Sequence, residues 1–210
     1  MTSDRPDYQT ILPSLRASYD GDAAYREDSD IHLWKAAHRA RILRCLQSES
    51  ASSLLEIGAG VGRDSLYFQE NGLDVTTTDL SPEMVARCRN KGLNAHVMDF
   101  LSLDFPAQSF DAVYAMNCLL HVPSKELLGV LHHIQTFLKS DGLFFFNQYG
   151  GEDQEGVREQ DYTDPPRFFC HYSDERILSL VSEAFEVISF EQVNIGSGDP
   201  VRSHLQALIL

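Results

Sequence analysis

The feature that most constrains the fold is a short apolar run that leads directly into a glycine-rich loop. Residues 54–57 have the composition of a buried strand, residues 58–62 read Gly-Ala-Gly-Val-Gly, and a helical pattern follows through Leu66 and Phe68. Glycines let a backbone turn sharply and approach a ligand without Cβ clashes. The start of the helix beyond them offers free N–H groups and a positive dipole end to an anion. This segment therefore predicts a strand–loop–helix unit built around a ligand.

The spacing of these glycines excludes two common nucleotide-binding loops. A dinucleotide fingerprint needs Gly-x-Gly-x-x-Gly, and its third glycine would fall at position 63, which is Arg63. A P-loop needs a glycine followed by Lys and then by Ser or Thr, and the chain has no such sequence. A nicotinamide-dependent oxidoreductase is therefore disfavoured.

From about residue 53 onward, strand-like and helix-like segments alternate. The clearest helix follows Ser124 and places Leu127, Leu131 and Ile134 on one face. Such alternation predicts an α/β fold with a mostly parallel sheet covered by helices on both faces. The strand-like runs are residues 54–57, 74–78, 95–98, 112–116, 143–147, 185–193 and 205–210.

Two segments fall outside this alternation. Residues 1–50 contain two expected helices, at about 10–19 and 31–47, which should form an N-terminal helical cap or lid on the rim of the sheet. Residues 150–172 are rich in turn formers and carry six acidic residues against two arginines. Long loops inside compact domains are usually functional. We interpret this second segment either as a further lid or as a solvated insertion.

Two acidic residues stand where neighbouring strands are expected to end. Asp79 follows the run at 74–78, where a carboxylate can accept both hydroxyl groups of a ribose. Asp99 follows the run at 95–98, where it could accept from an adenine amino group beside Phe100. Either acid alone could instead be a helix cap or a turn former. Together with the glycine loop, they place ligand-binding groups at the carboxyl ends of three successive strands.

These segments resemble the motifs of class I S-adenosylmethionine-dependent methyltransferases. The resemblance rests on residues 56–62, on residues 79–84 (Asp-Leu-Ser-Pro-Glu-Met), on the Asp99 segment and on residues 110–114. It implies a Rossmann-like, doubly wound sheet of seven strands, mostly parallel, with an antiparallel last strand. It also implies that residues 51–210 are the S-adenosylmethionine-binding methyltransferase domain, which packs with residues 1–50 as one compact unit.

The resemblance further implies which residues bind the cofactor, S-adenosylmethionine. Arg63 is expected to neutralise its carboxylate, unless Arg63 forms a surface ion pair with Asp64 or Glu70. Trp34 is expected either to close over the cofactor or to pack within the helical cap. The expected set is Gly58, Gly60 and Asn117 at the methionine part, Asp79 at the ribose, and Leu80, Asp99 and Phe100 at the adenine, together with Glu56, Ala59, Arg63, Met84 and Trp34.

Catalytic residues are harder to predict, because methyl transfer from a sulfonium is an in-line displacement with an activated leaving group. The protein supplies mostly alignment, dry surroundings and, for a hydroxyl acceptor, a base. The candidate bases are His121 after the fourth strand, Tyr149 after the fifth, and His171 beyond the acidic segment. Alternatively, His121 orients or packs beneath the cofactor, and the aromatic residues around His171 pack the core.

The composition limits the partners. The chain has 17 Lys and Arg against 31 Asp and Glu, a formal net charge of −14, so we expect neither nucleic acid nor a membrane as a partner. Residues 1–7 lack the apolar core of a signal peptide. The four cysteines lack the spacing of a metal site. We therefore expect a cytoplasmic monomer or homodimer without a metal.

The expected activity is methyl transfer to an oxygen or nitrogen atom of a small molecule. The acidic segment favours a cationic or amine-bearing acceptor, although an acidic surface kept for solubility explains the same charge. Two other functions stay open. One is methylation of the end of a peptide or protein, and the other is a non-catalytic module that binds S-adenosylmethionine.

Overall fold

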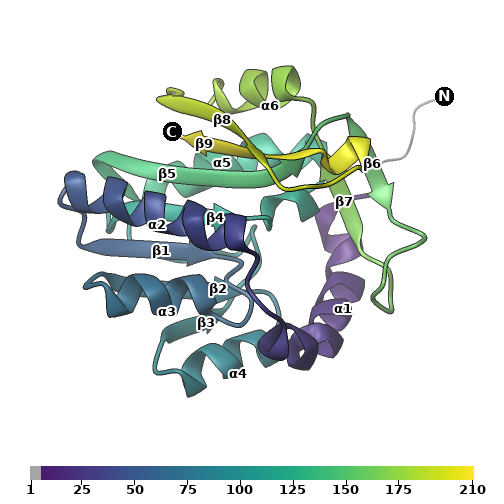
Figure 1. Ribbon diagram of the computed structural model, residues 1–210, viewed down its shortest axis with the longest axis horizontal. Coiled ribbons are helices and arrows are strands. Elements are labelled where there is room, and N and C mark those ends of the chain that lie inside the picture. Colours follow the sequence, from purple (N-terminus) through teal and green to yellow (C-terminus); the bar gives the residue numbers. More distant parts are fainter. Residues whose placement is uncertain (1–5) are drawn as a thin grey trace.

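A seven-stranded sheet between two layers of helices is the centre of the computed structural model, which describes residues 6–210 (Figure 1). The strand order is β3-β2-β1-β4-β5-β9-β8, and only β9 runs antiparallel to its neighbours. The predicted fold is therefore confirmed. The strands are β1 (Ser53–Ile57), β2 (Asp74–Asp79), β3 (Asn94–Val97), β4 (Phe110–Met116), β5 (Leu138–Gly150), β8 (Ser189–Asn194) and β9 (His204–Ile209).

The helices cover the sheet because alternate strand residues point to opposite faces. Leu54 of β1 packs with residues of α2 and α3, whereas its neighbour Leu55 packs in a separate cluster with residues of α5 and α6. Both leucines are fully buried. The helices are α1 (Tyr8–Asp28), α2 (Leu33–Ser48), α3 (Arg63–Glu70), α4 (Pro82–Asn90), α5 (Ser124–Phe137) and α6 (Asp174–Val181), with the short turns η1 (Leu119–His121) and η2 (Pro200–Arg202).

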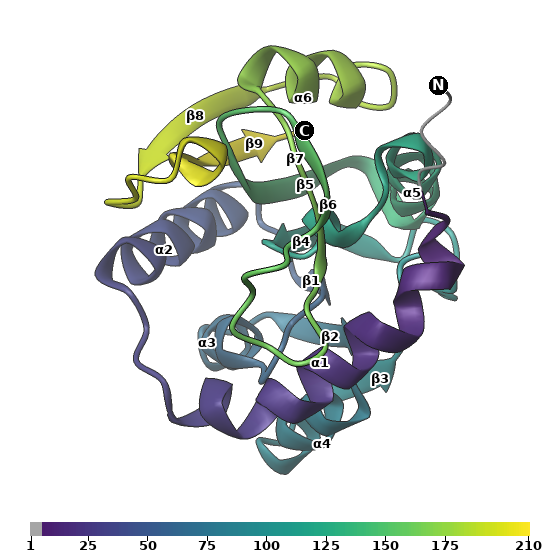
Figure 2. The same ribbon diagram turned by 90° about the vertical axis from the view of Figure 1, so that its right-hand side faces the viewer.

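The strand order also creates a place for a ligand. The chain proceeds outward from β1 through β2 to β3, and then returns to place β4 on the other side of β1. In open α/β sheets the crevice outside the carboxyl ends of the strands at such a switch point is where ligands bind. Helix α1 lies across this edge, beyond the arrowheads of the parallel strands in Figure 1 and in front of the sheet in Figure 2.

Helix α1 is longer than the sequence pattern predicts. It continues from the expected end near residue 19 to Asp28, although Gly21 and four acidic residues at 20–28 weaken the helical pattern. Contacts from the rest of the molecule hold this extension. Lys91 pairs with Glu27 at 2.7 Å, and Arg63 donates to main-chain carbonyls at the end of the helix. Residues 1–5 of the expected cap lie outside the described residues.

Two other segments differ from the expectation in detail. The turn-rich segment 150–172 contains an antiparallel hairpin of β6 (Gln154–Val157) and β7 (Phe168–His171). The expected break at Asp141 and Gly142 is a bulge inside β5, where the register with β4 shifts and Asp141 has a φ of 65°. Among residues 6–210, no helix is both long and apolar enough to cross a bilayer.

The packing of α5 gives a test of the core. Leu131 is fully buried on the helix face that meets the sheet, so we expect Leu131→Ala to lower the free energy of unfolding by about 2–5 kcal/mol through lost burial and a cavity. Leu33→Ala is the control, because Leu33 is 89% exposed and its replacement should change stability by less than about 0.5 kcal/mol. Urea denaturation measures both, and equal losses would contradict this packing.

Candidate functional site

A cavity of about 520 Å³ lies at the carboxyl ends of β1, β2 and β4. Its floor is the glycine-rich loop at 58–62 with the residues that follow β2 and β4. Helix α1 forms the roof through Leu15, Tyr19 and Arg26. Tyr162, Arg167 and other residues of the 150–172 segment close one side. The switch point of the sheet is thus a lined cavity and not an open edge.

The glycine loop needs its glycines for conformation and for space. Gly58 and Gly60 have φ values of 69° and 58°, in the region where a side chain is strained. A Cβ on Gly58 would lie 2.4 Å from the Cβ of Cys118, so this glycine lets the loop pack directly on the segment after β4. A Cβ on Gly60 would meet nothing within 4 Å. The backbone at Gly60 is therefore exposed to whatever occupies the cavity.

Asp79 joins the end of β2 to this loop. One carboxylate oxygen accepts from the Gly60 N–H at 2.8 Å, and the other accepts from the Ser81 N–H at 2.9 Å. Burial raises the pKa of this carboxyl above its ordinary value, against the effect of these two hydrogen bonds. Each oxygen retains acceptor capacity, since a carboxylate offers about four lone-pair positions. Asp79 can therefore hold the loop and accept from a diol at the same time.

Glu56 lies at the carboxyl end of β1 and lines the same cavity. It is 3% exposed and accepts a hydrogen bond from the Ser65 hydroxyl. Burial, and then the charge of Asp64, raise its pKa from 4.5 to about 8. Arg39 and the Tyr114 hydroxyl both donate to Asp64 at 3.2 Å. A cationic group in the cavity would therefore be attracted to the carboxyl groups of Glu56 and Asp64.

The residues expected at an adenine ring divide between the cavity and other positions. Leu80 and Phe100 line the cavity from the ends of β2 and β3 and give it an apolar wall. Asp99 does not line it, because one carboxylate oxygen of Asp99 accepts from the N–H groups of Leu101 and Ser102 in a local turn. Met84 is fully buried behind the glycine loop, in a cluster with Val61 and Ala23.

Asn117 brings an unpaired polar atom to the cavity. It follows β4 with a φ of 53°, its backbone N–H donates to the Asn147 carbonyl at 2.8 Å, and its side chain lines the cavity. The side-chain Oδ1 is buried without a hydrogen-bond partner among the described residues. A buried unpaired acceptor costs free energy unless a ligand satisfies it. A donor in the cavity is the simplest partner for this oxygen.

Arg63 forms neither of the ion pairs considered from the sequence. One terminal nitrogen of its guanidinium donates to the carbonyls of Arg26 and Glu27, both at 2.8 Å, and to the carbonyl of Ser29. These are the carbonyl groups at the C-terminal end of α1, where a helix has unpaired acceptors and a partial negative charge. Arg63 also lines the cavity. It therefore fastens the roof to the glycine loop.

His121 is in the cavity and both of its ring nitrogens are engaged. Nδ1 lies 2.7 Å from the Phe168 carbonyl, which only accepts, so Nδ1 carries the proton. Nε2 then accepts from the Tyr19 hydroxyl at 2.5 Å. Burial, together with the charges of Arg167 and Arg26, lowers the pKa of His121 from 6.5 to about 3. The ring is therefore neutral, and it meets the cavity through Tyr19.

The other two predicted bases, Tyr149 and His171, line different cavities. Tyr149 lines the cavity described above. The ring of Trp34 lies against the ring of Tyr149, with centroids 6.3 Å apart, but Trp34 does not line this cavity. His171 does not line this cavity. Its Nδ1 donates to the Tyr149 carbonyl at 3.3 Å, and its ring lines a second cavity on the other side. His121 and Tyr149 thus line the larger cavity, whereas His171 lines the second one.

The acidic residues of the 150–172 segment do not line the cavity. Among them, Asp161 forms a paired contact with Arg167 at 2.7 and 2.8 Å. Arg167 is 6% exposed and lies over the ring of Tyr19 at 5.4 Å. The segment also reaches α1 where Ser18 donates to the Pro165 carbonyl and Tyr162 donates to Asp22. Asp161 thus holds Arg167 within the loop, and Pro165 and Tyr162 attach the loop to α1.

Sequence reasoning missed several residues of this site, chiefly Tyr19, Arg26 and Arg167. Tyr19 follows Leu15 by four residues, so a helical face carrying both was visible in the sequence. Nothing in the sequence indicated that this face would cover the glycine loop. Arg167 lies in a segment without periodicity, and only the hairpin of β6 and β7 brings it to Tyr19.

Comparison with known proteins gives a consistent family. A family model described as a methyltransferase domain matches residues 30–189. A sterol 24-C-methyltransferase of Gibberella zeae is 32% identical over 132 residues, which is 58% of this chain and 33% of that protein. A phosphoethanolamine N-methyltransferase of Plasmodium falciparum is 22% identical over 148 residues, covering 68% of this chain and 53% of that protein. The chain thus spans between a third and about half the length of these relatives.

Among solved structures, a 1,6-didemethyltoxoflavin N1-methyltransferase of Burkholderia thailandensis has the same fold. It superposes with a TM-score of 0.77 over 100% of this chain and 92% of that one, at 20% identity. That crystal structure contains 1,6-didemethyltoxoflavin and S-adenosylhomocysteine. The [4+2]-cyclase SpnF also superposes, with a TM-score of 0.67 over 98% of this chain and 96% of that one, at 18% identity.

The raised pKa of Glu56 predicts a pH dependence of stability. Its pKa is about 8 in the folded chain and about 4.3 in an unfolded one, so folding takes up a proton between these values. The protonated Glu56 therefore favours the folded chain at low pH, and the free energy of unfolding falls as the pH rises from about 4 to 8. Glutamine cannot ionise, so Glu56→Gln should not lose stability in this way. At pH 8.5 the ligand-free variant should therefore have a higher free energy of unfolding than the wild type.

Urea denaturation at pH 5 and pH 8.5 measures this difference. Glu70→Gln is the control, because Glu70 is exposed at the end of α3. If the difference between Glu56→Gln and the wild type were the same at both pH values, a protonated Glu56 would be excluded.

Proposed function

The chain belongs to the family of methyltransferase domains, and from this premise we propose that it transfers a methyl group from S-adenosylmethionine to a nitrogen or oxygen atom of a small molecule. The observation that carries the proposal is the floor of the cavity. There Asp79 accepts a hydrogen bond from the glycine loop, and no side chain covers the backbone of the loop at Gly60. A [4+2]-cyclase shares the fold. The architecture alone therefore does not define the activity, which depends on the residues of the site.

The residues present fit this cofactor. The apolar wall of Leu80 and Phe100 suits an adenine ring, and Asp79 suits the ribose hydroxyls. The unpaired Oδ1 of Asn117 suits the amino group of the methionine part, with Glu56 nearby in the lining. When bound, S-adenosylmethionine supplies an activated methyl group on a sulfonium. Asp99, Met84 and Trp34 are then second-layer candidates whose contacts with the cofactor stay predictions.

Arg63 supports this arrangement in a different way from the one expected. One terminal nitrogen of its guanidinium donates to carbonyl groups of α1 and of the residue that follows it. We therefore propose that Arg63 fixes the roof over the methionine part and that its other guanidinium nitrogens stay available to the carboxylate of the cofactor. The Gly60 N–H already donates to Asp79, so the positive end of α3 remains the group available to an anion.

The protein's main contribution to the reaction is alignment in dry surroundings. Helix α1 and the loop at 158–167 meet over the cavity through Tyr162 and Asp22 and through Arg167 and Tyr19. Closure of this kind excludes water and fixes the approach of the acceptor, and orientation alone contributes on the order of 7–11 kcal/mol in favourable cases. Residues 6–50 therefore act as the cap of the domain at 51–210.

For a hydroxyl or ammonium acceptor, the pair of Tyr19 and His121 provides a route for the proton. The Tyr19 oxygen accepts a hydrogen bond from the acceptor's O–H or N–H while its own proton is directed to Nε2 of the neutral His121 at 2.5 Å. Because the pKa of His121 is lowered to about 3, the ring does not hold a full positive charge, and the pair draws the acceptor's proton toward Tyr19 while Nδ1–H fixes the ring on the Phe168 carbonyl. Tyr149 is the alternative base on the other wall, whereas His171 does not line this cavity and is not placed to act directly.

The acceptor class is proposed from the lining and from the relatives. Relatives act on sterols and on phosphoethanolamine, and a protein of the same fold acts on a toxoflavin precursor, according to their names. Four tyrosines, at 19, 25, 149 and 162, line the cavity, and aromatic faces attract cations. This supports an amine-bearing acceptor better than the acidic segment does, because that segment's carboxylates lie outside the cavity lining.

The cellular setting is also a proposal. All four cysteines are free thiols, and three of them are buried, as is common in a reducing compartment. This supports a cytoplasmic location. A monomer or a homodimer remains the proposed oligomeric state.

Removing the carboxylate of Asp79 should weaken cofactor binding. We expect Asp79→Asn to lower the affinity for S-adenosylmethionine by about 10- to 150-fold, the loss of a charged hydrogen-bond pair of ~1.5–3 kcal/mol. Asp74→Asn is the matched control, since Asp74 begins the same strand and is exposed. Isothermal calorimetry measures both variants. Binding of NADH in place of S-adenosylmethionine and its demethylated product would overturn the proposed function.

Removing only the hydroxyl of Tyr19 tests the proton route. With an acceptor identified by release of S-adenosylhomocysteine from a panel of amines and alcohols, Tyr19→Phe should lower kcat by about 10²- to 10⁴-fold with cofactor affinity unchanged. Tyr67→Phe is the control, because Tyr67 lies on α3 outside the cavity lining. Turnover of Tyr19→Phe and His121→Ala at the wild-type rate across the pH range would exclude this pair as the base.

A further inference from the structure

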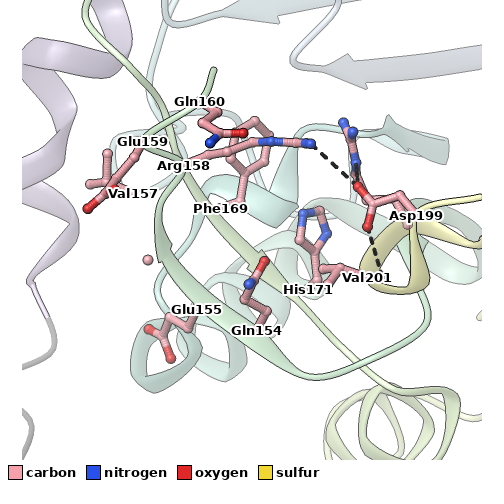
Figure 3. Close-up of a pocket in the computed structure, with 12 residues that line it drawn as sticks. Gln154, Glu155, Val157, Arg158, Glu159, Gln160, Phe169, His171, Asp199 and Val201 are labelled. Atoms are coloured by element: carbon pink, nitrogen blue, oxygen red, sulfur yellow. Dashed lines mark hydrogen bonds and ion pairs between the residues drawn. The ribbon is translucent and has the colours of Figure 1, made fainter. Parts of the chain in front are cut away.

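A second cavity, of about 410 Å³, lies on the other side of the β6–β7 hairpin, and the proposed function leaves it without a role. Its walls are this hairpin and the η2 turn that leads into β9 (Figure 3). Phe169 and Arg202 line both cavities. The two spaces are therefore neighbours, separated by the end of β7.

The second cavity contains a cluster of charged residues with two arginines and one aspartate. Arg158 and Arg202 both donate to the same carboxylate oxygen of Asp199, at 3.4 and 3.1 Å. The other oxygen of Asp199 accepts from the Val201 N–H at 3.1 Å. Two guanidinium groups on one carboxylate leave one positive charge uncompensated. Among residues 6–210, the side chain of Arg202 donates only through Nε and that of Arg158 only through Nη2, so most of their N–H groups are available.

The acidic residues of the lining do not cancel this charge. Figure 3 shows Glu155 and Glu159 on the side opposite Asp199 and His171. The carboxylate of Glu155 accepts from the Ser124 N–H at 3.2 Å and from the Ser124 hydroxyl at 2.7 Å. Glu159 is exposed to solvent, where its field is screened. The basic side of the cavity is therefore locally positive in a protein whose net charge is −14.

The remaining wall can admit a small polar group. Phe169 and His171 stack with ring centroids 5.5 Å apart and an interplanar angle of 12°. Nδ1 of His171 donates to the Tyr149 carbonyl at 3.3 Å, and Nε2 has no partner among the described residues. Gly156 also lines the cavity, and a Cβ there would meet nothing within 4 Å. The cavity thus combines free donors with open space.

We propose that this second cavity binds an oxyanion, a carboxylate or phosphate group, carried by the end of the methyl acceptor that is remote from the methylated atom. Guanidinium groups match the geometry of such anions and bind them through several N–H groups at once. Arg202 borders both cavities, so an acceptor reaching past Phe169 would place its anionic end on Arg202 and Arg158. The proposal rests on the proposed function, since it assumes that the acceptor reacts in the larger cavity.

The first experiment tests the site without cofactor or acceptor. Inorganic phosphate is titrated into the ligand-free chain, and binding is followed by the ring resonances of His171 in NMR spectra. We expect saturable shifts of these resonances, and about tenfold weaker binding in Arg158→Gln and in Arg202→Gln. Arg44→Gln, an exposed arginine on α2, should bind phosphate as the wild type does. Equal binding in all four proteins would overturn the proposal.

The second experiment tests whether the oxyanion belongs to the acceptor. With S-adenosylhomocysteine present, calorimetry compares O-phosphoethanolamine with ethanolamine, which differ only in the phosphate. We expect the phosphorylated amine to bind at least about tenfold more tightly, and the preference to disappear in Arg158→Gln, which lies outside the larger cavity. Phosphate binding without this preference would mean that the site takes a free anion, and would overturn the assignment to the acceptor.

Folding and cofactor binding are checked separately. Arg158→Gln, at a residue outside the lining of the larger cavity, should keep the wild-type melting temperature within a few degrees and the wild-type affinity for S-adenosylhomocysteine. A chain that binds phosphate through Arg158 but binds neither S-adenosylmethionine nor S-adenosylhomocysteine would refute the proposed function while leaving the anion site intact. The two failures are therefore distinguishable.

Discussion

The close approach between Gly58 and Cys118 is the contact on which the site depends. With a Cβ-to-Cβ separation of 2.4 Å for any side chain at position 58, only glycine allows the loop after β1 to rest on the segment after β4. That contact brings the two central strand ends together at the point where the strand order reverses. Asp79 then holds the same loop from the β2 side. The cavity floor is one packed surface made from three strand ends.

The sequence allowed this floor to be predicted because local rules determine it. Strand periodicity, the glycines of 58–62 and the acid at Asp79 each carry a local physical requirement, and the parallel sheet brings their ends to one edge. Asp99 shows the limit of the same reasoning, since its carboxylate is taken up by the Leu101 and Ser102 N–H groups. A pattern can locate a strand end, but the local turn decides where the side chain points.

The roof and the side wall were much less predictable, because long-range contacts decide them. The second half of α1 includes Gly21 and several acids, and it is helical where Arg63 and Lys91 bind its C-terminal end. The segment at 150–172 has no clear period, yet it forms a hairpin that brings Arg167 to Tyr19. Neither outcome can be read from spacing, since the partners lie from 36 to 148 residues apart in sequence.

Helix α1 is fastened at both of its ends, and this determines how ligands can enter and leave. At its start the Tyr8 N–H donates to Glu126, and at its end Arg63 binds the last carbonyl groups. A swing of the whole helix would break both attachments together. The loop at 158–167 is held over the cavity by contacts with the middle and the second half of α1, some of them through the exposed side chain of Tyr162. A displacement of that loop would leave both attachments of α1 intact and would open the side of the cavity without moving its roof.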